Sequence, residues 1–362
     1  MMKLRTAVVL GGVGLSVLGV AVAQQGCSSD DPGASAGAGK TPPKRPDGPA
    51  TTSTDNRTYA IAELKLGLNN DWKKYGYDLD GKVSVSGAKD VCKPRAGADK
   101  KVHADGDSGI DNAFGQFIVP TLTSIPNVTD LEGTVNDAFK QGSFGVLFQV
   151  KGLVDGAPNA TGLSGQIFNA LKLGKTPAFD KTDVWPVNKQ LLTGGTVDSG
   201  SKIKFSNSYV SAGTFVSGDP STVTLSLSLA GVSIDLDINN AIITFDTKTG
   251  TSGIIAGILD ANKLGDQIKK VVPKIPQLAC NTSIEGTVQS VVDTITSNAD
   301  IMIGGKPNAA AECDGISIGV GFTVKEVANP TTAVDPDPPG PPPNCSGDGG
   351  TDSGNPQDAG TD

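Results

Sequence analysis

A segment rich in Asp and Gly is the part of this sequence whose residue types and spacing could do chemistry. It runs from Asp105 to Asp111 and reads DGDSGID. Carboxylates at its first, third and seventh positions can converge on a hard cation, as in calcium-binding loops. A second acidic pair, Asp78 and Asp80, lies upstream. The pattern indicates a calcium site at Asp105, Asp107 and Asp111. The alternative is an Asp-rich turn that accepts its own backbone hydrogen bonds before a helix capped by Asp111.

The same segment excludes two familiar kinds of site. An EF-hand needs Gly where Ile110 stands and a bidentate Glu where Gln116 stands. The tetrad GDSG at 106–109 also surrounds the nucleophile of chymotrypsin-like proteases, but in those proteins the histidine lies far upstream. Here the only histidine is the nearby His103. Ser-His-Asp, Cys-His and zinc chemistry would all depend on His103, which we expect to be a solvated surface residue.

The five cysteines suit export and disulfides better than metal binding, because no two have C-x-x-C spacing. If Cys27 carries lipid, four remain, and four cysteines allow three pairings. We expect Cys280 to pair with Cys313, because a helix and a turn-rich return between them would close a local loop. Cys92 would then pair with Cys345.

The first residues have the pattern of an export signal. Two basic residues precede an uncharged apolar run at 7–23, and Gly26 precedes Cys27. This favours a lipoprotein whose signal peptide is removed before Cys27 and whose acyl chains, such as palmitate, anchor it to the outer membrane or cell surface. Cleavage after Ala23 is the competing outcome and would leave a periplasmic or secreted protein. An uncleaved membrane anchor is the third.

Composition divides the rest of the chain into a core and two polar ends. We expect a signal peptide at 1–26, a disordered tether at 27–58, a folded domain at 59–328 and a disordered tail rich in Pro, Gly and Asp at 329–362. The formal net charge of -8 argues against nucleic acid as a partner, because phosphate binding needs a basic stripe.

The clearest period-2 pattern lies between residues 222 and 247. Its phase changes at Ala230-Gly231, so a two-residue hairpin there would pair Leu225 with Leu236 and place the apolar side chains on one face. A second turn at Asn239-Asn240 would complete a three-stranded meander. The competing interpretation is one long strand with a bulge at Ala230-Gly231.

Other segments complete a mainly β fold. Further strands are predicted at 144–150, 203–215 and 316–324, with weaker candidates at 59–66 and 77–85. Amphipathic helices are predicted at 129–142, 260–272 and 282–295, capped by a Thr129/Glu132 capping box, by Asp260 and by Thr282. Sheets with one apolar face can cover each other, so we expect an antiparallel β-sandwich of jelly-roll or lectin-like type with peripheral helices.

The leader, the tether and the segment from Cys92 through 105–115 resemble uncharacterised bacterial surface lipoproteins, in which a Cys is followed by a DGxxGIDNxFG pattern. The resemblance covers about a third of the chain. It implies a surface lipoprotein and implies no activity.

We therefore expect a non-enzymatic, lipid-anchored surface binding or structural protein, with a polysaccharide or a surface protein as its ligand. The alternative is a calcium-supported extracellular polysaccharide hydrolase. Hydrolysis would need a cleft that gathers two carboxylates and an aromatic platform such as Trp72 or Trp185.

Overall fold

The computed structural model describes residues 39–125, 130–229, 232–274 and 284–337 of the 362-residue chain. The strands are β1 (Asn56–Lys65), β2 (Gly145–Lys151), β3 (Ala160–Ala170), β4 (Val187–Asn188), β5 (Ile203–Ser211), β6 (Thr214–Val216), β7 (Ser221–Leu229), β8 (Val232–Asp246), β9 (Gly253–Asp260), β10 (Gly315–Val327) and β11 (Ala333–Val334). The α-helices are α1 (Val119–Thr123), α2 (Leu131–Lys140), α3 (Ala261–Val271) and α5 (Ile284–Ser297). A π-helix, η2 (Phe114–Ile118), precedes α1, and 3-10 turns are η1 (Asp71–Lys73), η3 (Lys189–Leu191), η4 (Thr193–Gly195) and η5 (Val272–Lys274).

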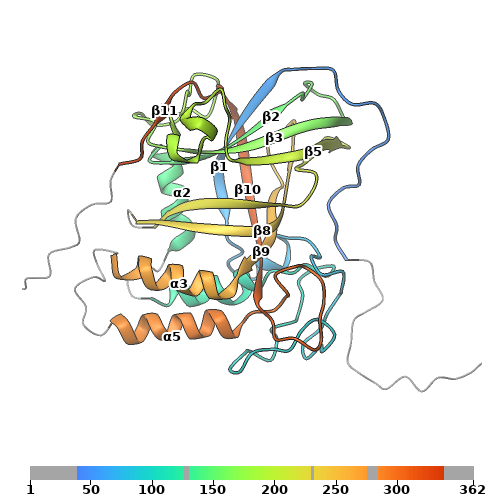
Figure 1. Cartoon of the computed structure of the whole chain (residues 1–362), viewed down its shortest axis with the longest axis vertical. Coiled ribbons are helices and arrows are strands. Elements are labelled where there is room, and N and C mark those ends of the chain that lie inside the picture. The colour runs from blue at the N-terminus through green and yellow to red at the C-terminus, as the bar shows by residue number, and fades with distance from the viewer. Residues whose placement is uncertain (1–38, 126–129, 230–231, 275–283, 338–362) are drawn as a thin grey trace, which may run out of the picture. The chain divides into compact units, whose positions relative to one another are not determined.

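Within the described residues, eight antiparallel strands close into a β-barrel (Figure 1). The order is β3-β2-β1-β10-β9-β8-β6-β5, and β5 pairs back with β3. Strands β4, β7 and β11 extend the sheet outside this ring. The predicted β-sandwich is therefore wrong. The strands do have an apolar face, but a single sheet curls to cover that face with itself, and closure pairs the edge strands that a sandwich would leave open.

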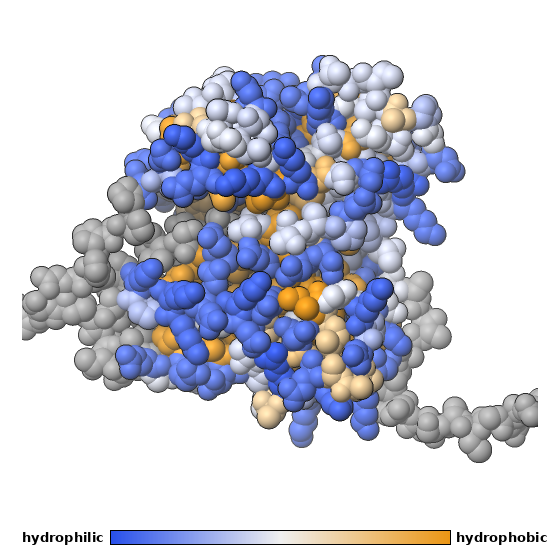
Figure 2. All heavy atoms as spheres, in the orientation of Figure 1, coloured by the Kyte–Doolittle hydropathy of each residue, from blue (hydrophilic) through white to orange (hydrophobic). Residues whose placement is uncertain are grey.

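Aromatic side chains fill the barrel interior around Phe245. Its ring centroid lies 5.1 Å from that of Tyr59, 5.0 Å from Phe215, 6.1 Å from Phe148 and 6.3 Å from Phe322. All five residues are buried and come from five different barrel strands. Two smaller apolar clusters, around Trp185 and around Tyr77, lie outside the barrel interior. The surface of the molecule is mostly hydrophilic in the view of Figure 2.

The register of the first predicted hairpin is confirmed. Leu225 pairs with Leu236 and Val223 with Ile238, and the pairing of β7 with β8 continues to Leu229. Leu236 is buried while the Asp residues at 235 and 237 are exposed, so the apolar side chains of β8 from Ile234 to Ile238 do share one face.

The second predicted hairpin is wrong, because β8 runs without a turn to Asp246. Asn240 does adopt a positive φ of 50°, as expected of a turn residue, but it lies where the registers of β8 with β7 and with β9 both shift. An extra residue in a bulge changes the side-chain phase as a turn would. The competing interpretation of one long strand with a bulge at Ala230-Gly231 is also wrong, because β7 and β8 pair with each other as antiparallel strands.

The predicted helices are present, with different N-terminal details. Asp260 caps α3 as predicted and accepts hydrogen bonds from two backbone N–H groups of its first turn. In α2 the cap is Asp130, which accepts from Gly133 N at 2.8 Å, whereas Glu132 accepts from Leu66 N on the neighbouring segment. The N-cap is therefore Asp130, one residue after the predicted Thr129. Thr129 and Thr282 lie outside the described residues. Among the helices that the structure describes, none is both long and apolar enough to cross a membrane.

The folded domain extends beyond the predicted limits of 59 and 328. Residues 39–55 were expected to belong to a free tether, but Lys40 N donates to Ser108 O at 2.7 Å and Ala50 forms a parallel bridge with Thr161. Strand β11, in the predicted tail, pairs with β4. Backbone hydrogen bonds hold both segments to the domain, and Ala333 of β11 also packs against a buried apolar cluster that includes Phe168 and Trp185.

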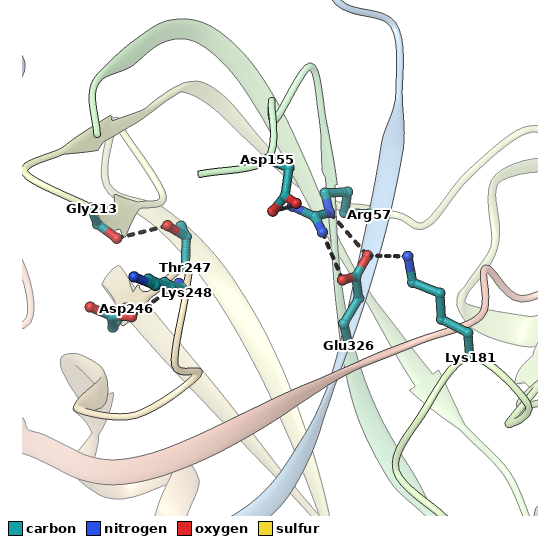
Figure 3. Close-up of polar contacts among 8 residues, drawn as sticks. All are labelled: Arg57, Asp155, Lys181, Gly213, Asp246, Thr247, Lys248 and Glu326. Atoms are coloured by element: carbon teal, nitrogen blue, oxygen red, sulfur yellow. Dashed lines mark hydrogen bonds and ion pairs between the residues drawn. The ribbon is translucent and has the colours of Figure 1, made fainter. Parts of the chain in front are cut away.

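A partly buried ion-pair network joins β1 to β10 (Figure 3). Arg57 donates to both carboxylate oxygens of Glu326, at 3.0 and 2.8 Å, and to Asp155 at 2.7 Å, while Lys181 lies 3.2 Å from Glu326. Burial would raise the pKa of Glu326, but the hydrogen bonds from Arg57 and Lys181 outweigh it and hold that pKa below its ordinary value. The network ties the loops after β2 and β3 to the barrel wall.

Candidate functional site

Three carboxylates converge at loops outside the barrel strands. Ligand-capable atoms of Asp78, Asp80 and Asp111 all lie within 4.8 Å of one another. The predicted strand at 77–85 is wrong: this segment forms turns, in which Asp78 accepts from Gly81 N and Asp80 from Lys82 N. These turns aim short acidic side chains into one small volume.

Two hydrogen bonds of Asp111, one from its backbone and one to its side chain, hold the two contributing loops together. Asp111 N donates to Tyr77 O at 3.1 Å, and Leu79 N donates to Asp111 Oδ2 at 2.6 Å. Asp111 is buried, and it does not cap the following helical segment, because Gly115 N donates to Asn112 instead. The carboxylate is therefore positioned by the fold and is not used as a helix cap.

Two further carboxylates extend this group into what we call the acidic cluster, made of Asp78, Asp80, Asp105, Asp111 and Asp300. Asp105 accepts from Ser84 N at 2.5 Å, and Asp300 accepts from the backbone and hydroxyl of Ser317. Among the described residues, no Lys, Arg or His forms an ion pair within 4.0 Å of any member.

Burial and mutual repulsion make ionisation of the acidic cluster unfavourable. Burial, reinforced by the charges of Asp80, Asp300 and Asp78, raises the pKa of Asp105 to about 8. Burial raises the pKa of Asp300 to about 7, and burial with repulsion from Asp78 raises that of Asp80 to about 6. Burial also raises the pKa of Asp111 well above its usual range. Such a group is stable when protonated or when a cation neutralises it.

The structure divides the predicted calcium ligands. Asp111 joins Asp78 and Asp80, and Asp105 adds its charge to the same acidic cluster. Asp107 is exposed and lies outside the convergent group, and its N–H donates to Lys73 O. Asp300 was not predicted, because it follows α5 in a segment without acidic periodicity and is brought in by tertiary contact with β10.

The predicted presence of a disulfide is confirmed, but its pairing differs. Cys92 bonds to Cys313 across 221 residues, so the predicted pairs Cys280–Cys313 and Cys92–Cys345 are both replaced. Cys280 and Cys345, like the predicted lipid-bearing Cys27, lie outside the described residues. The prediction of Cys280–Cys313 rested on the low entropy cost of closing a short loop. The fold instead places the segments around Cys92 and Cys313 side by side.

His103 is not the solvated residue that the sequence suggested. It is buried, with Nδ1 2.8 Å from Ala88 O and Nε2 3.5 Å from Cys313 Sγ. Both indoles are buried too: Trp72 is 8% exposed and Trp185 is 1% exposed, so neither presents a flat face to a ligand. Both indoles therefore belong to the packing of the domain.

A polar groove of about 540 Å³ lies on the outside of the barrel, over β2, β3 and β5. We call it the amide groove. Its polar lining includes Asn56, Gln149, Lys151, Ser164, Gln166, Asp198, Lys204 and Asn329. Asp198 is the one carboxylate among these lining residues.

Hydrogen bonds orient the amides of this groove. Gln149 Nε2 donates to Asn329 Oδ1 and Thr58 Oγ1, both at 3.2 Å. Gln166 Nε2 donates to Gln149 Oε1 at 2.6 Å, and Ser201 N donates to Gln166 Oε1 at 2.9 Å. These hydrogen bonds fix the orientation of each side-chain amide, so the donor and acceptor groups on the groove floor have defined positions.

Comparison with known proteins adds no assignment: no family model, no curated protein and no solved structure matches this chain.

Proposed function

We propose that this chain is a non-enzymatic, lipid-anchored surface protein that binds a polysaccharide. The observation that carries the proposal is the amide groove. Neutral amides and hydroxyls can both donate to and accept from sugar hydroxyl groups, and the pre-oriented amides lose little entropy on binding. Lys151 and Lys204, both exposed, add positive charge at the rim and would suit an acidic sugar.

We do not extend the proposal to polysaccharide hydrolysis. Glycoside cleavage by the usual mechanism needs two carboxyl groups facing the scissile bond. The described lining of the amide groove offers Asp198 alone, and the carboxylates of the acidic cluster are largely buried and crowded together. The buried Trp72 and Trp185 supply no stacking platform.

Binding in the amide groove can be blocked without disturbing its hydrogen bonds. Ser164 is exposed on β3 within the groove, so Ser164→Trp should fill the space and abolish capture on an array of neutral and acidic polysaccharides. Ser206→Trp, at an exposed position on β5 outside the groove lining, is the matched control and should bind like the unmodified protein. Equal binding by both variants, or no binding by the unmodified protein, would refute the proposal.

The proposed anchor is a lipid on Cys27, which would place the protein at the outer membrane or cell surface. Cys27→Ser should move the protein from the membrane fraction to the soluble fraction, because several acyl chains anchor stably where one is marginal. The intact mass of the mature protein checks the same point. A mature N-terminus at Gln24 would instead show ordinary secretion.

We further propose that the acidic cluster holds Ca²⁺, which would stabilise the domain outside the cell, where calcium is abundant. Hard carboxylate oxygens are the ligands that Ca²⁺ prefers, and Asp78, Asp80 and Asp111 offer three in one small volume. Ser84 is a neighbour of the cluster, because its N–H donates to Asp105, and its buried Oγ has no hydrogen-bond partner among the described residues.

Asp111→Asn should weaken calcium binding at least about 10-fold, because a neutral amide replaces a charged carboxylate ligand, a change that should cost at least as much as the loss of an outer-shell partner. The unmodified protein should melt at a higher temperature in millimolar calcium than in chelator, since a ligand of the folded state stabilises it by mass action. Asp107→Asn, in the same loop but exposed, should keep that response. Melting curves that coincide in calcium and in chelator would contradict the site.

A further inference from the structure

Cys92, His103 and Cys313 form a buried group, the cysteine–histidine centre, that neither the calcium site nor the amide groove uses. His103 Nε2 lies 3.5 Å from Cys313 Sγ and 3.9 Å from Cys92 Sγ. All three residues are less than 5% exposed, and their potential ligand atoms lie within 4.8 Å of one another. Two sulfurs and one imidazole nitrogen therefore meet at one point in the interior.

The hydrogen bond of His103 directs a lone pair at the sulfurs. Ala88 O only accepts, so Nδ1 at 2.8 Å must carry a proton, and in the neutral imidazole Nε2 is then unprotonated. Disulfide sulfurs carry no proton to donate to it. An imidazole with one nitrogen bound to a backbone carbonyl and the other facing soft ligands is the arrangement of a metal-binding histidine.

The frame around the two cysteines does not depend on the bond between them. Lys93 N donates to Ala311 O at 2.7 Å, Cys313 N donates to Lys93 O at 3.0 Å, and Asn308 N donates to Val91 O at 2.6 Å. These backbone bonds join the same two segments on both sides of the disulfide. Cleaving the sulfur–sulfur bond would therefore leave both side chains facing His103.

We propose that the cysteine–histidine centre has a second, reduced state that binds Zn²⁺ through Cys92 Sγ, Cys313 Sγ and His103 Nε2. A dithiol reductant supplies two electrons and two protons to the disulfide and is itself oxidised to a disulfide, so Cys92 and Cys313 become two thiols. Zn²⁺ then displaces both thiol protons and forms two zinc–sulfur bonds and one zinc–nitrogen bond. Thiolate and imidazole select zinc over the calcium that suits the acidic cluster.

The redox conditions and the zinc concentration around the protein determine which of the two states forms. The disulfide is the form expected in an oxidising compartment, and the zinc form belongs to reducing, zinc-containing conditions. Cys92 Sγ also lies 3.4 Å from Asp300 O, so the centre adjoins the acidic cluster through the backbone of one residue. The inference does not depend on the proposed function.

The test uses the full chain with Cys27, Cys280 and Cys345 replaced by Ser, so that Cys92 and Cys313 are the remaining cysteines. The chain is unfolded and reduced with a water-soluble phosphine, which becomes the phosphine oxide with oxygen from water, and is then refolded with Co²⁺ as a spectroscopic probe. We expect one Co²⁺ per chain with thiolate-to-cobalt charge-transfer absorption that Zn²⁺ displaces. Cobalt held by carboxylates alone lacks this absorption, and the oxidised chain should also lack it.

His103→Asn should weaken Co²⁺ binding by more than about 10-fold, the range seen even for outer-shell partners of a metal. Absence of the thiolate absorption in the folded, reduced chain overturns the proposal, and so does equal affinity in His103→Asn. If the reduced chain does not fold without metal, Zn²⁺ should restore its far-ultraviolet circular dichroism. A reduced chain that stays unfolded with Zn²⁺ also overturns the proposal.

Discussion

Calcium-free protein should become less stable as the pH rises from about 4 to about 8. The carboxyls of Asp80, Asp300 and Asp105 have pKa values of about 6, 7 and 8 in the folded chain, against an ordinary value of 3.8. Between these limits the folded state binds more protons than the unfolded state, so the free energy of unfolding falls with rising pH. At about 1.4 kcal/mol for each pKa unit, the fully buried Asp300 alone accounts for about 4 kcal/mol.

Denaturant unfolding at pH 5 and pH 8, with chelator, measures this loss, and added calcium should reverse most of it at pH 8, where the carboxylates are ionised. Asp105→Asn should flatten the pH dependence, because it removes one of the groups that resist ionisation. Asp107→Asn is the control and should leave the slope unchanged. If the protein in chelator is equally stable or more stable at pH 8 than at pH 5, the carboxyl groups of the acidic cluster do not have raised pKa values.

Phe245→Ala should lower the free energy of unfolding by about 3 to 5 kcal/mol, the range for removing a buried aromatic ring from a core. Phe245 is fully buried and contacts four other aromatic rings, so its loss leaves a cavity that strands of a closed barrel cannot easily collapse. Two-state denaturant unfolding in calcium measures the change.

Val154→Ala is the control for that measurement. Val154 is 48% exposed, and substitutions at such positions usually change stability by less than about 0.5 kcal/mol. A cost for Phe245→Ala no larger than that of the control would mean that the aromatic group does not lie in a packed barrel interior.

Local sequence patterns determined much of the secondary structure. The alternation of apolar and polar residues was enough to pair Leu225 with Leu236, because side-chain period and turn length together leave one register that buries every apolar residue. Asp260 was likewise readable as a helix cap from its position before an apolar stripe. Asn240 shows the limit of such patterns, since a bulge and a turn shift the phase alike.

The acidic cluster could be predicted only in part, because its members come from different segments of the chain. An Asp-rich loop identified Asp105 and Asp111, and the upstream pair Asp78 and Asp80 was also visible in the sequence. Which of these carboxylates meet depends on how two loops pack, and Asp300 joins them only through its bonds to Ser317 on β10. A short stretch of sequence cannot show which charged side chains lie close together in the folded chain.

Tertiary structure alone decided the closure of the sheet, the disulfide partner and the burial of His103. A strand with one apolar face suits a sandwich and a barrel equally well, so the pairing of β3 with β5 could not be read from either strand. Cys92 and Cys313 are 221 residues apart, and the entropy cost of closing a loop favours cysteines that are near in sequence. Here the folded chain already brings the loop before β10 beside residues 91–93, so this entropy cost does not decide the pairing. Sequence determines which faces must be buried, whereas packing of the whole chain determines what buries them.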